Sequence, residues 1–210
     1  MKTNVYIDSF SLYYGCLKAS NYRWLDVLSL CNFELPANSI NRIRCFSARV
    51  TARPGDLQQP ERQAAYFRAL ETIPDLSIHL GQFLESQIRM PYVTPPPGGP
   101  NTVLVRKTEE KGSDVNLASY LLLDGFRSEY EAAIVISNDS DLTEPIRIVR
   151  KELGLKVAVL LPCRPSGHPS VELRKVATKH KIISEAALAA SQFPAVMHDR
   201  NGTITKPATW

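Results

Sequence analysis

The amino-acid sequence predicts an α/β fold built on a mainly parallel sheet. Segments with strand-like patterns alternate along the chain with segments of helical spacing, which is the order typical of parallel α/β proteins. Two strand-like segments, residues 132–136 and 157–161, are uninterrupted apolar runs. Such runs favour parallel strands, because helices cover a parallel sheet on both faces.

The first half of the chain contains two predicted strands and three predicted helical segments. Residues 4–8, with the sequence NVYID, have the pattern of a short apolar strand, and residues 40–50 alternate apolar and polar side chains as a half-buried strand does. The helical patterns cover residues 9–20, 24–31 and 60–73, the last with Pro60 at its start.

Residues 77–94 are predicted to be extended, and a proline-rich tract follows them. The tract TPPPGGP, residues 94–100, cannot belong to a helix or a central strand, because proline fixes φ and lacks an N–H. We expect a surface loop here, and a docking site for a partner is the alternative.

The second half of the chain alternates more regularly. We expect a helix at residues 113–126 that begins with two residues of capping type, Ser113 and Asp114. The further predicted elements are a strand at 131–137, a helix at 141–154, a strand at 156–162, a short helix at 170–177, a strand and a helix within 180–191, and a hairpin around Asn201-Gly202. We assign residues 1–190 to one domain and residues 191–210 to a C-terminal extension.

Composition and charge are those of an ordinary globular protein. Of the 210 residues, 44% are hydrophobic and 22% charged, and the net charge of +4 neither requires nor excludes a polyanionic partner. The four cysteines form no C-x-x-C pair and follow no secretory signal, so we expect reduced thiols in a cytoplasmic protein. No apolar run is long enough to span a membrane.

Four aspartates occupy positions that a parallel sheet would bring together. Asp8, Asp139 and Asp141 each follow a predicted strand, and Asp114 lies at the start of a helix. The carboxyl ends of parallel strands meet at one edge, so these groups can converge. Their mutual repulsion would be relieved by a hard divalent cation, Mg²⁺ or Mn²⁺. The alternative is that these acids have structural roles. Asp114 would then be a helix cap, as would Asp139 or Asp141, and Asp8 would be an acidic loop residue.

Three blocks of the sequence resemble the NYN domain family of the PIN-like nuclease superfamily. They are NVYIDSFSLYYG, EEKGSDVNLASYLLLDGF and AAIVISNDSDLTEPIRIVRKELGLKVAVL. The family's blocks read as a strand with Asp-Gly-Phe-Asn, then Lys-Gly-x-Asp with a helix, then a strand with Ser-x-Asp-Ser-Asp. The blocks of this chain stand in the same order and together span residues 4–161.

The resemblance implies a PIN-like, Rossmannoid three-layer sandwich and metal-dependent hydrolysis of RNA. The matching acidic cluster, implied to bind Mg²⁺ or Mn²⁺ and to be catalytic, is Asp8, Asp114, Asp139 and Asp141. Ser137 matches a serine that shapes the loop. The implied partners are RNA and a second copy of the chain in a homodimer, with no membrane.

The chain departs from the family pattern in the first block. Ser9 and Ser11 replace the usual glycine and asparagine, so backbone freedom and an amide donor are lost while every acid remains. Ser11 and Ser137 are therefore expected to have supporting roles. The candidates for RNA binding are Lys111, Arg42 and Arg44, together with Arg49, Arg53, Arg106 and Lys107, each of which is otherwise a solvated basic residue.

Two other functions compete with a ribonuclease. One is a catalytically weak RNA-binding or regulatory module, because the changed first block puts substrate positioning in doubt. The other is a small-molecule enzyme on the same fold. Against the second, no G-x-G-x-x-G or P-loop motif follows a strand, and the four histidines are scattered without metal-ligand spacing.

Overall fold

A seven-stranded sheet forms the centre of the computed structural model, which describes residues 1–164 and 166–210. Its strand order is β4-β3-β2-β1-β5-β6-β7, and every neighbouring pair is parallel except β3 and β4. The predicted α/β fold with a mainly parallel sheet is confirmed. The strands are β1 (Lys2–Asp8), β2 (Ser39–Ala48), β3 (Leu76–Pro91), β4 (Thr102–Lys111), β5 (Ala132–Ile136), β6 (Lys156–Leu161) and β7 (Lys179–Ile182).

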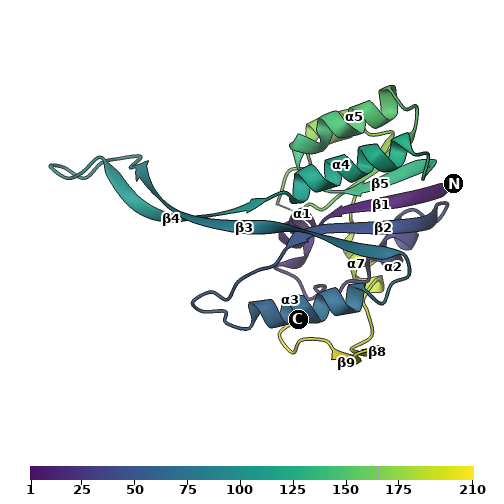
Figure 1. The fold of residues 1–210 in the computed structure, drawn as a ribbon, viewed down its shortest axis with the longest axis horizontal. Coiled ribbons are helices and arrows are strands. Elements are labelled where there is room, and N and C mark those ends of the chain that lie inside the picture. Colours follow the sequence, from purple (N-terminus) through teal and green to yellow (C-terminus); the bar gives the residue numbers. More distant parts are fainter. Residues whose placement is uncertain (165) are drawn as a thin grey trace.

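Helices cover both faces of this sheet and give it three layers (Figure 1). The helical elements are α1 (Ser9–Leu12), the π-helical η1 (Tyr13–Leu17), α2 (Val27–Glu34), α3 (Gln59–Leu70), α4 (Ser113–Phe126), the 3-10 turn η2 (Ser140–Leu142), α5 (Thr143–Lys151), α6 (Val171–Val176) and α7 (Glu185–Ala190). One hydrophobic cluster joins the sheet to α4, α5 and α6, and a second joins it to α2, α3 and α7.

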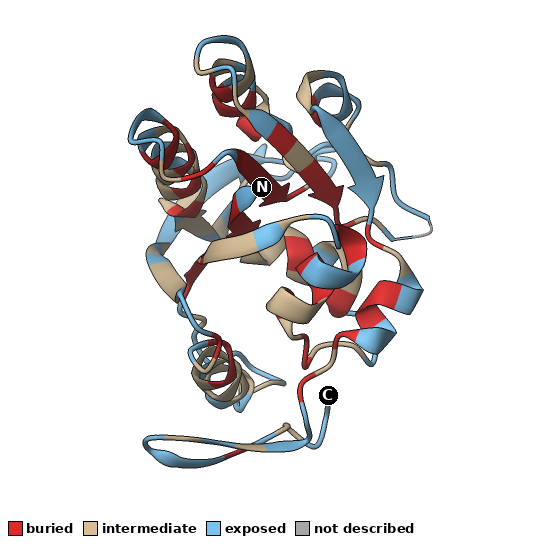
Figure 2. Ribbon diagram, turned by 90° about the vertical axis from the view of Figure 1, so that its right-hand side faces the viewer, coloured by how far each residue is buried: buried red, intermediate tan, exposed pale blue. Residues whose placement is uncertain are grey.

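Alternation along the central strands supplies both clusters. In β1, Val5 and Ile7 enter the cluster with α2 and α3, whereas Tyr6 enters the cluster with α4. All five residues of β5 are buried, as its apolar run predicts. Figure 2 shows the buried residues concentrated in the central strands and on the inner sides of the helices.

The β3–β4 hairpin extends beyond the body of the molecule as a long arm (Figure 1). The proline-rich tract at 94–100 lies at its tip, and the expected loop is confirmed. Strand β4 is an element that the sequence patterns did not indicate. Its short apolar stretch, residues 103–105, is followed by five charged residues among the next six, and it becomes a strand by pairing with β3.

The last twenty residues pack against the body. Strands β8 (Val196–Asp199) and β9 (Gly202–Thr205) form the predicted hairpin around Asn201-Gly202. Arg68 of α3 donates hydrogen bonds to both carboxylate oxygens of Asp199, at 2.7 and 3.0 Å. In the part of the chain that the structure describes, no helix combines the length and apolar character needed to cross a membrane.

Candidate active site at the ends of strands β1 and β5

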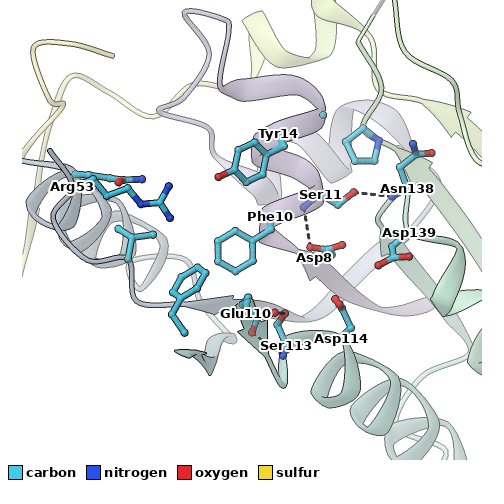
Figure 3. Close-up of a pocket in the computed structure, with 15 residues that line it drawn as sticks. Asp8, Phe10, Ser11, Tyr14, Arg53, Glu110, Ser113, Asp114, Asn138 and Asp139 are labelled. Atoms are coloured by element: carbon cyan, nitrogen blue, oxygen red, sulfur yellow. Dashed lines mark hydrogen bonds between the residues drawn. The ribbon is translucent and has the colours of Figure 1, made fainter. Parts of the chain in front are cut away.

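A cavity of about 590 Å³ opens at the carboxyl ends of β1 and β5. The chain leaves β1 toward β2 on one side and later returns to β5 on the other, so this is the point where the strand order reverses. Open α/β sheets bind ligands at such a point. Asp8, Asp114 and Asp139 line the cavity, and their carboxyl groups point toward a common space (Figure 3).

Asp8, at the end of β1, is buried with 5% of its surface exposed. Its Oδ1 accepts a hydrogen bond from the Ser11 amide at 2.9 Å, and its Oδ2 accepts one from the Ser137 hydroxyl at 2.8 Å. Burial raises the pKa of Asp8, and the negative charge of Asp139 raises it further, against the lowering effect of these hydrogen bonds. Ser11 and Ser137 thus fix the orientation of the Asp8 carboxyl group, which has no basic partner among the described residues.

Ser11 also connects the two central strands across the sheet. Its hydroxyl oxygen accepts a hydrogen bond from the Asn138 amide at 2.8 Å (Figure 3). The Asn138 side chain in turn accepts from the Ser170 amide at 2.7 Å. The serine that departs from the family pattern therefore keeps the ends of β1 and β5 joined.

Asp139 caps the 3-10 turn η2, because its Oδ1 accepts a hydrogen bond from the Asp141 amide at 3.0 Å. One of these two acids was predicted to cap the helix at 141–154; Asp139 instead caps the 3-10 turn just before α5, and it also lines the cavity. Asp141 is exposed and is not part of the cavity lining, so its predicted role as a metal ligand stays a prediction. Its charge nevertheless contributes to the raised pKa of Asp114.

Helix α4 begins differently from the sequence prediction. The N-cap position is Gly112, with φ of +98°, and neither Ser113 nor Asp114 is the cap. Glu110 satisfies the helix end instead: its carboxylate accepts from the Ser113 amide at 3.2 Å and from the Ser113 hydroxyl at 2.6 Å. The Asp114 carboxyl group is therefore free to face the cavity (Figure 3).

Asp114 carries the clearest electrostatic signature of the site. Burial, followed by the charges of Asp8, Asp139, Glu110 and Asp141, raises the pKa of Asp114 to about 6. Such a shift is what crowded carboxylates produce when no positive charge compensates them.

The donor chemistry of the cavity fits a hard divalent cation. Asp8, Asp114 and Asp139 offer oxygen atoms only, and in the described part of the chain none of the three forms an ion pair with a basic side chain. Within residues 1–164 and 166–210, no group of three or more acidic, histidine or cysteine side chains is arranged to hold an ion directly. Mg²⁺ often binds through one or two carboxylates and several waters, and this arrangement suits that mode.

The remaining walls of the cavity are aromatic and basic. Phe10 and Phe83 pack edge to face with ring centres 5.7 Å apart, and Phe83 comes from the base of the β3–β4 arm. Arg53 lies across the cavity from the aspartates (Figure 3). Sequence patterns did not indicate Phe83 or Glu110 as site residues, although the acidic pair Glu109-Glu110 shortly before Gly112 was a signal for Glu110.

Three of the other predicted basic residues have acidic partners outside the cavity. Arg44 forms a bidentate pair with Asp124 at 2.9 and 3.1 Å, beneath the Tyr120 ring, and its side chain is only 13% exposed. Arg42 pairs with Glu129. Lys111 is exposed and lies 3.4 Å from Glu109. Contact of these residues with RNA stays a prediction.

Comparison with known proteins gives three findings. The NYN domain model matches residues 2–185 of this chain. The 6-hydroxy-3-succinoylpyridine 3-monooxygenase HspA from Pseudomonas putida is 31% identical over 240 residues, covering all of this chain and 75% of that protein. A crystal structure of a protein of unknown function from Vibrio parahaemolyticus superposes with a TM-score of 0.57 at 16% identity, over 91% of this chain and 96% of that one. The last likeness shows the fold alone.

Proposed function

This chain belongs to the NYN domain family, and from that premise we propose that it is a Mg²⁺- or Mn²⁺-dependent endoribonuclease. The observation that carries the proposal is the set of three carboxyl groups, on Asp8, Asp114 and Asp139, that face one cavity without a basic partner. RNA is the proposed substrate, and hydrolysis of a phosphodiester bond is the proposed reaction.

The roles of the side chains follow from their surroundings. Asp8 and Asp139 are the proposed metal ligands, because Ser11 and Ser137 hold Asp8 in place and η2 holds Asp139. A bound divalent ion would offset the charge developing on the phosphate oxygens and make water easier to deprotonate. Asp114, with a pKa of about 6, is suited to accept the proton of the attacking water near neutral pH.

Arg53 supplies the proposed contact to the phosphate backbone. It lies on the wall opposite the aspartates, and its guanidinium is exposed to the cavity mouth. A guanidinium matches the geometry of a phosphate group and stays charged at every physiological pH. Phe10 and Phe83, beside it, offer aromatic surface on which an unpaired base can stack.

Oxygenation of a small aromatic compound is the second candidate function. The identity of 31% to a 6-hydroxy-3-succinoylpyridine 3-monooxygenase, over the whole of this chain, favours it. In that case the acidic cavity would bind a small molecule instead of a phosphodiester. A third candidate, RNA binding without cleavage, follows from Ser9 and Ser11 in place of the family's glycine and asparagine.

Incubation of labelled single-stranded RNA with the protein and Mn²⁺ tests the proposal. We expect the wild type to cleave the RNA and chelation of the metal to abolish cleavage. We expect Asp139→Asn to lower the cleavage rate by at least about 100-fold, as other losses of a charge-stabilising group do. Glu71→Gln, an exposed acid outside the cavity lining, is the matched control and should cleave normally.

Three results separate the candidates. Equal product from the wild type and Asp139→Asn would contradict the proposed mechanism. Mn²⁺ binding measured by calorimetry, without cleavage, would favour the binding module. Consumption of a hydroxypyridine and oxygen in the presence of a two-electron reductant such as NADH, without RNA cleavage, would favour the oxygenase.

A further inference from the structure

A second cavity, of about 270 Å³, adjoins the acidic one. It lies on the face of the sheet that carries α3, and the two cavities share four lining residues: Phe10, Tyr14, Val50 and Gln59. A ligand in the second cavity would therefore lie next to the carboxyl groups of the first. The roles proposed above make no use of this second cavity.

The second cavity has the shape and lining of a site for an aromatic ring. Tyr13, Tyr66, Phe67 and Trp210 contribute aromatic surface, and Leu70 belongs to its apolar lining. An apolar cavity of about 150 Å³ is enough to hold benzene. A space of about 270 Å³ therefore accommodates one substituted ring, and aromatic walls favour a planar one.

Arg23 supplies positive charge to this lining. The Arg23 Nη atoms donate to the carbonyl oxygens of Thr209 and Lys18, at 3.0 and 2.9 Å. Among the described residues no carboxylate pairs with Arg23, whereas Arg62, also in the lining, is paired with Asp56. Because a guanidinium stays charged at physiological pH, it favours a ligand that carries a carbonyl or carboxylate oxygen.

We propose that this second cavity binds a single planar heteroaromatic ring bearing an oxygen acceptor, and that it presents the ring beside the acidic cavity. The ring could be a free heteroaromatic acid or an unstacked base of an RNA strand, since both bring the same chemistry. The proposal rests on the cavity and not on the proposed hydrolysis.

Isothermal titration calorimetry with nicotinate, without metal, tests binding of the free ring. Ser47, buried and part of the lining, is the position for a filling variant, Ser47→Phe. Val50→Trp blocks the junction at a half-buried loop position, and Thr51→Trp, at its exposed neighbour outside both linings, is the matched control. We expect the dissociation constant to rise at least tenfold in both cavity variants and to stay unchanged in Thr51→Trp.

A short RNA carrying one 2-aminopurine tests the other source. A change in its emission on binding, lost in Val50→Trp and kept in Thr51→Trp, would identify a base as the ring. Asp139→Asn should bind the ring as the wild type does even if it does not cleave RNA. Failure of the nuclease proposal and failure of the ring-binding proposal can therefore be told apart.

Near-ultraviolet circular dichroism checks that each variant is folded. If Ser47→Phe does not fold, the result with Val50→Trp decides. Absence of binding for both probes, or equal binding by wild type and folded cavity variants, would overturn the proposal.

Discussion

At the scale of single residues, the site differs from the rest of the chain in how its acids are compensated. Asp124 is almost wholly buried, and the Arg44 guanidinium compensates its charge while the Tyr6 hydroxyl donates a further hydrogen bond. Asp8 is buried to a similar extent but accepts from the neutral amide of Ser11 and the hydroxyl of Ser137. A divalent cation would therefore supply Asp8 with the positive charge that Arg44 supplies to Asp124.

The raised pKa of Asp114 predicts a dependence of stability on pH. The unfolded chain releases this proton near pH 3.8 and the folded chain near pH 6, so this group makes the free energy of unfolding fall as pH rises between those values. One pKa unit corresponds to about 1.4 kcal/mol. With screening at this half-buried position, we expect Asp114→Asn to stabilise the metal-free protein by about 1–2 kcal/mol at pH 7.5.

Urea unfolding of the two proteins at pH 4, 6 and 7.5 checks this prediction. The difference between wild type and Asp114→Asn should be small at pH 4 and reach its full size by pH 7.5. Glu71→Gln serves as the matched control and should change little at any of these pH values. A difference that does not depend on pH would refute the role given to carboxylate repulsion.

At the scale of elements, the start of α4 decides where the Asp114 carboxyl group points. Gly112 adopts a φ of +98°, which L-residues with a Cβ rarely adopt, and it turns the chain from β4 into the helix. Glu110 then satisfies the first helical amide in place of a conventional cap. The Lys-Gly-x-Asp pattern thus has a local physical reason, because the glycine permits the turn that places the aspartate.

We expect Gly112→Ala to lower the free energy of unfolding by about 1–2 kcal/mol and also to lower the rate of RNA cleavage, because the strained turn displaces the proposed proton acceptor, Asp114. Gly154→Ala is the control: Gly154 also has a positive φ, +67°, and an added Cβ would meet nothing within 4 Å. It should lose comparable stability with an unchanged rate of RNA cleavage. Equal effects of both variants on the cleavage rate would contradict the positioning role of Gly112.

A close approach between two elements shapes the other side of the cavity. A Cβ on Gly15 of η1 would lie 2.3 Å from the Pro162 carbonyl oxygen, which follows β6. The π-helical turn can therefore lie against the end of the sheet only with glycine at this position. This contact brings Tyr14 and Pro162 into the same lining.

At the scale of the whole molecule, the C-terminal residues complete the layer on the α3 side. Trp210 packs against Tyr66 and Trp24, with ring centres 5.8 and 6.2 Å apart, and the terminus lies beside α3 (Figure 1). Ile204 of β9 is buried in the same cluster. The extension therefore belongs to the packed body rather than trailing from it.

We expect Trp210→Ala to lower the free energy of unfolding by about 2 kcal/mol. The value is below the 3–5 kcal/mol typical of fully buried tryptophan, because Trp210 is half-buried. Val196→Ala, at an exposed position of β8, should cost less than about 0.5 kcal/mol. Chemical denaturation measures both, and equal losses would mean that the C-terminal tryptophan contributes nothing specific to the fold.

The layers of the fold and the location of the site follow from the order of the amino acids alone. Apolar runs at 132–136 and 157–161 specified buried parallel strands, because a strand buried on both faces has no polar positions to spare. In a parallel sheet the carboxyl ends of the strands share one edge, so Asp8 and Asp139 are expected to lie close together although 131 positions separate them. The family blocks added Asp114 to this pair. Their catalytic roles remain predictions.

Features that depend on partners far apart in the chain could not be predicted from local patterns. Strand β4 exists through its register with β3, and that hairpin brings Phe83 and Glu110 to the cavity. Arg44 pairs with Asp124 from a helix 80 positions away, whereas Asp141 faces solvent. Local patterns report which face of an element is buried, but the partner of a charged side chain is set by packing between elements far apart in the chain.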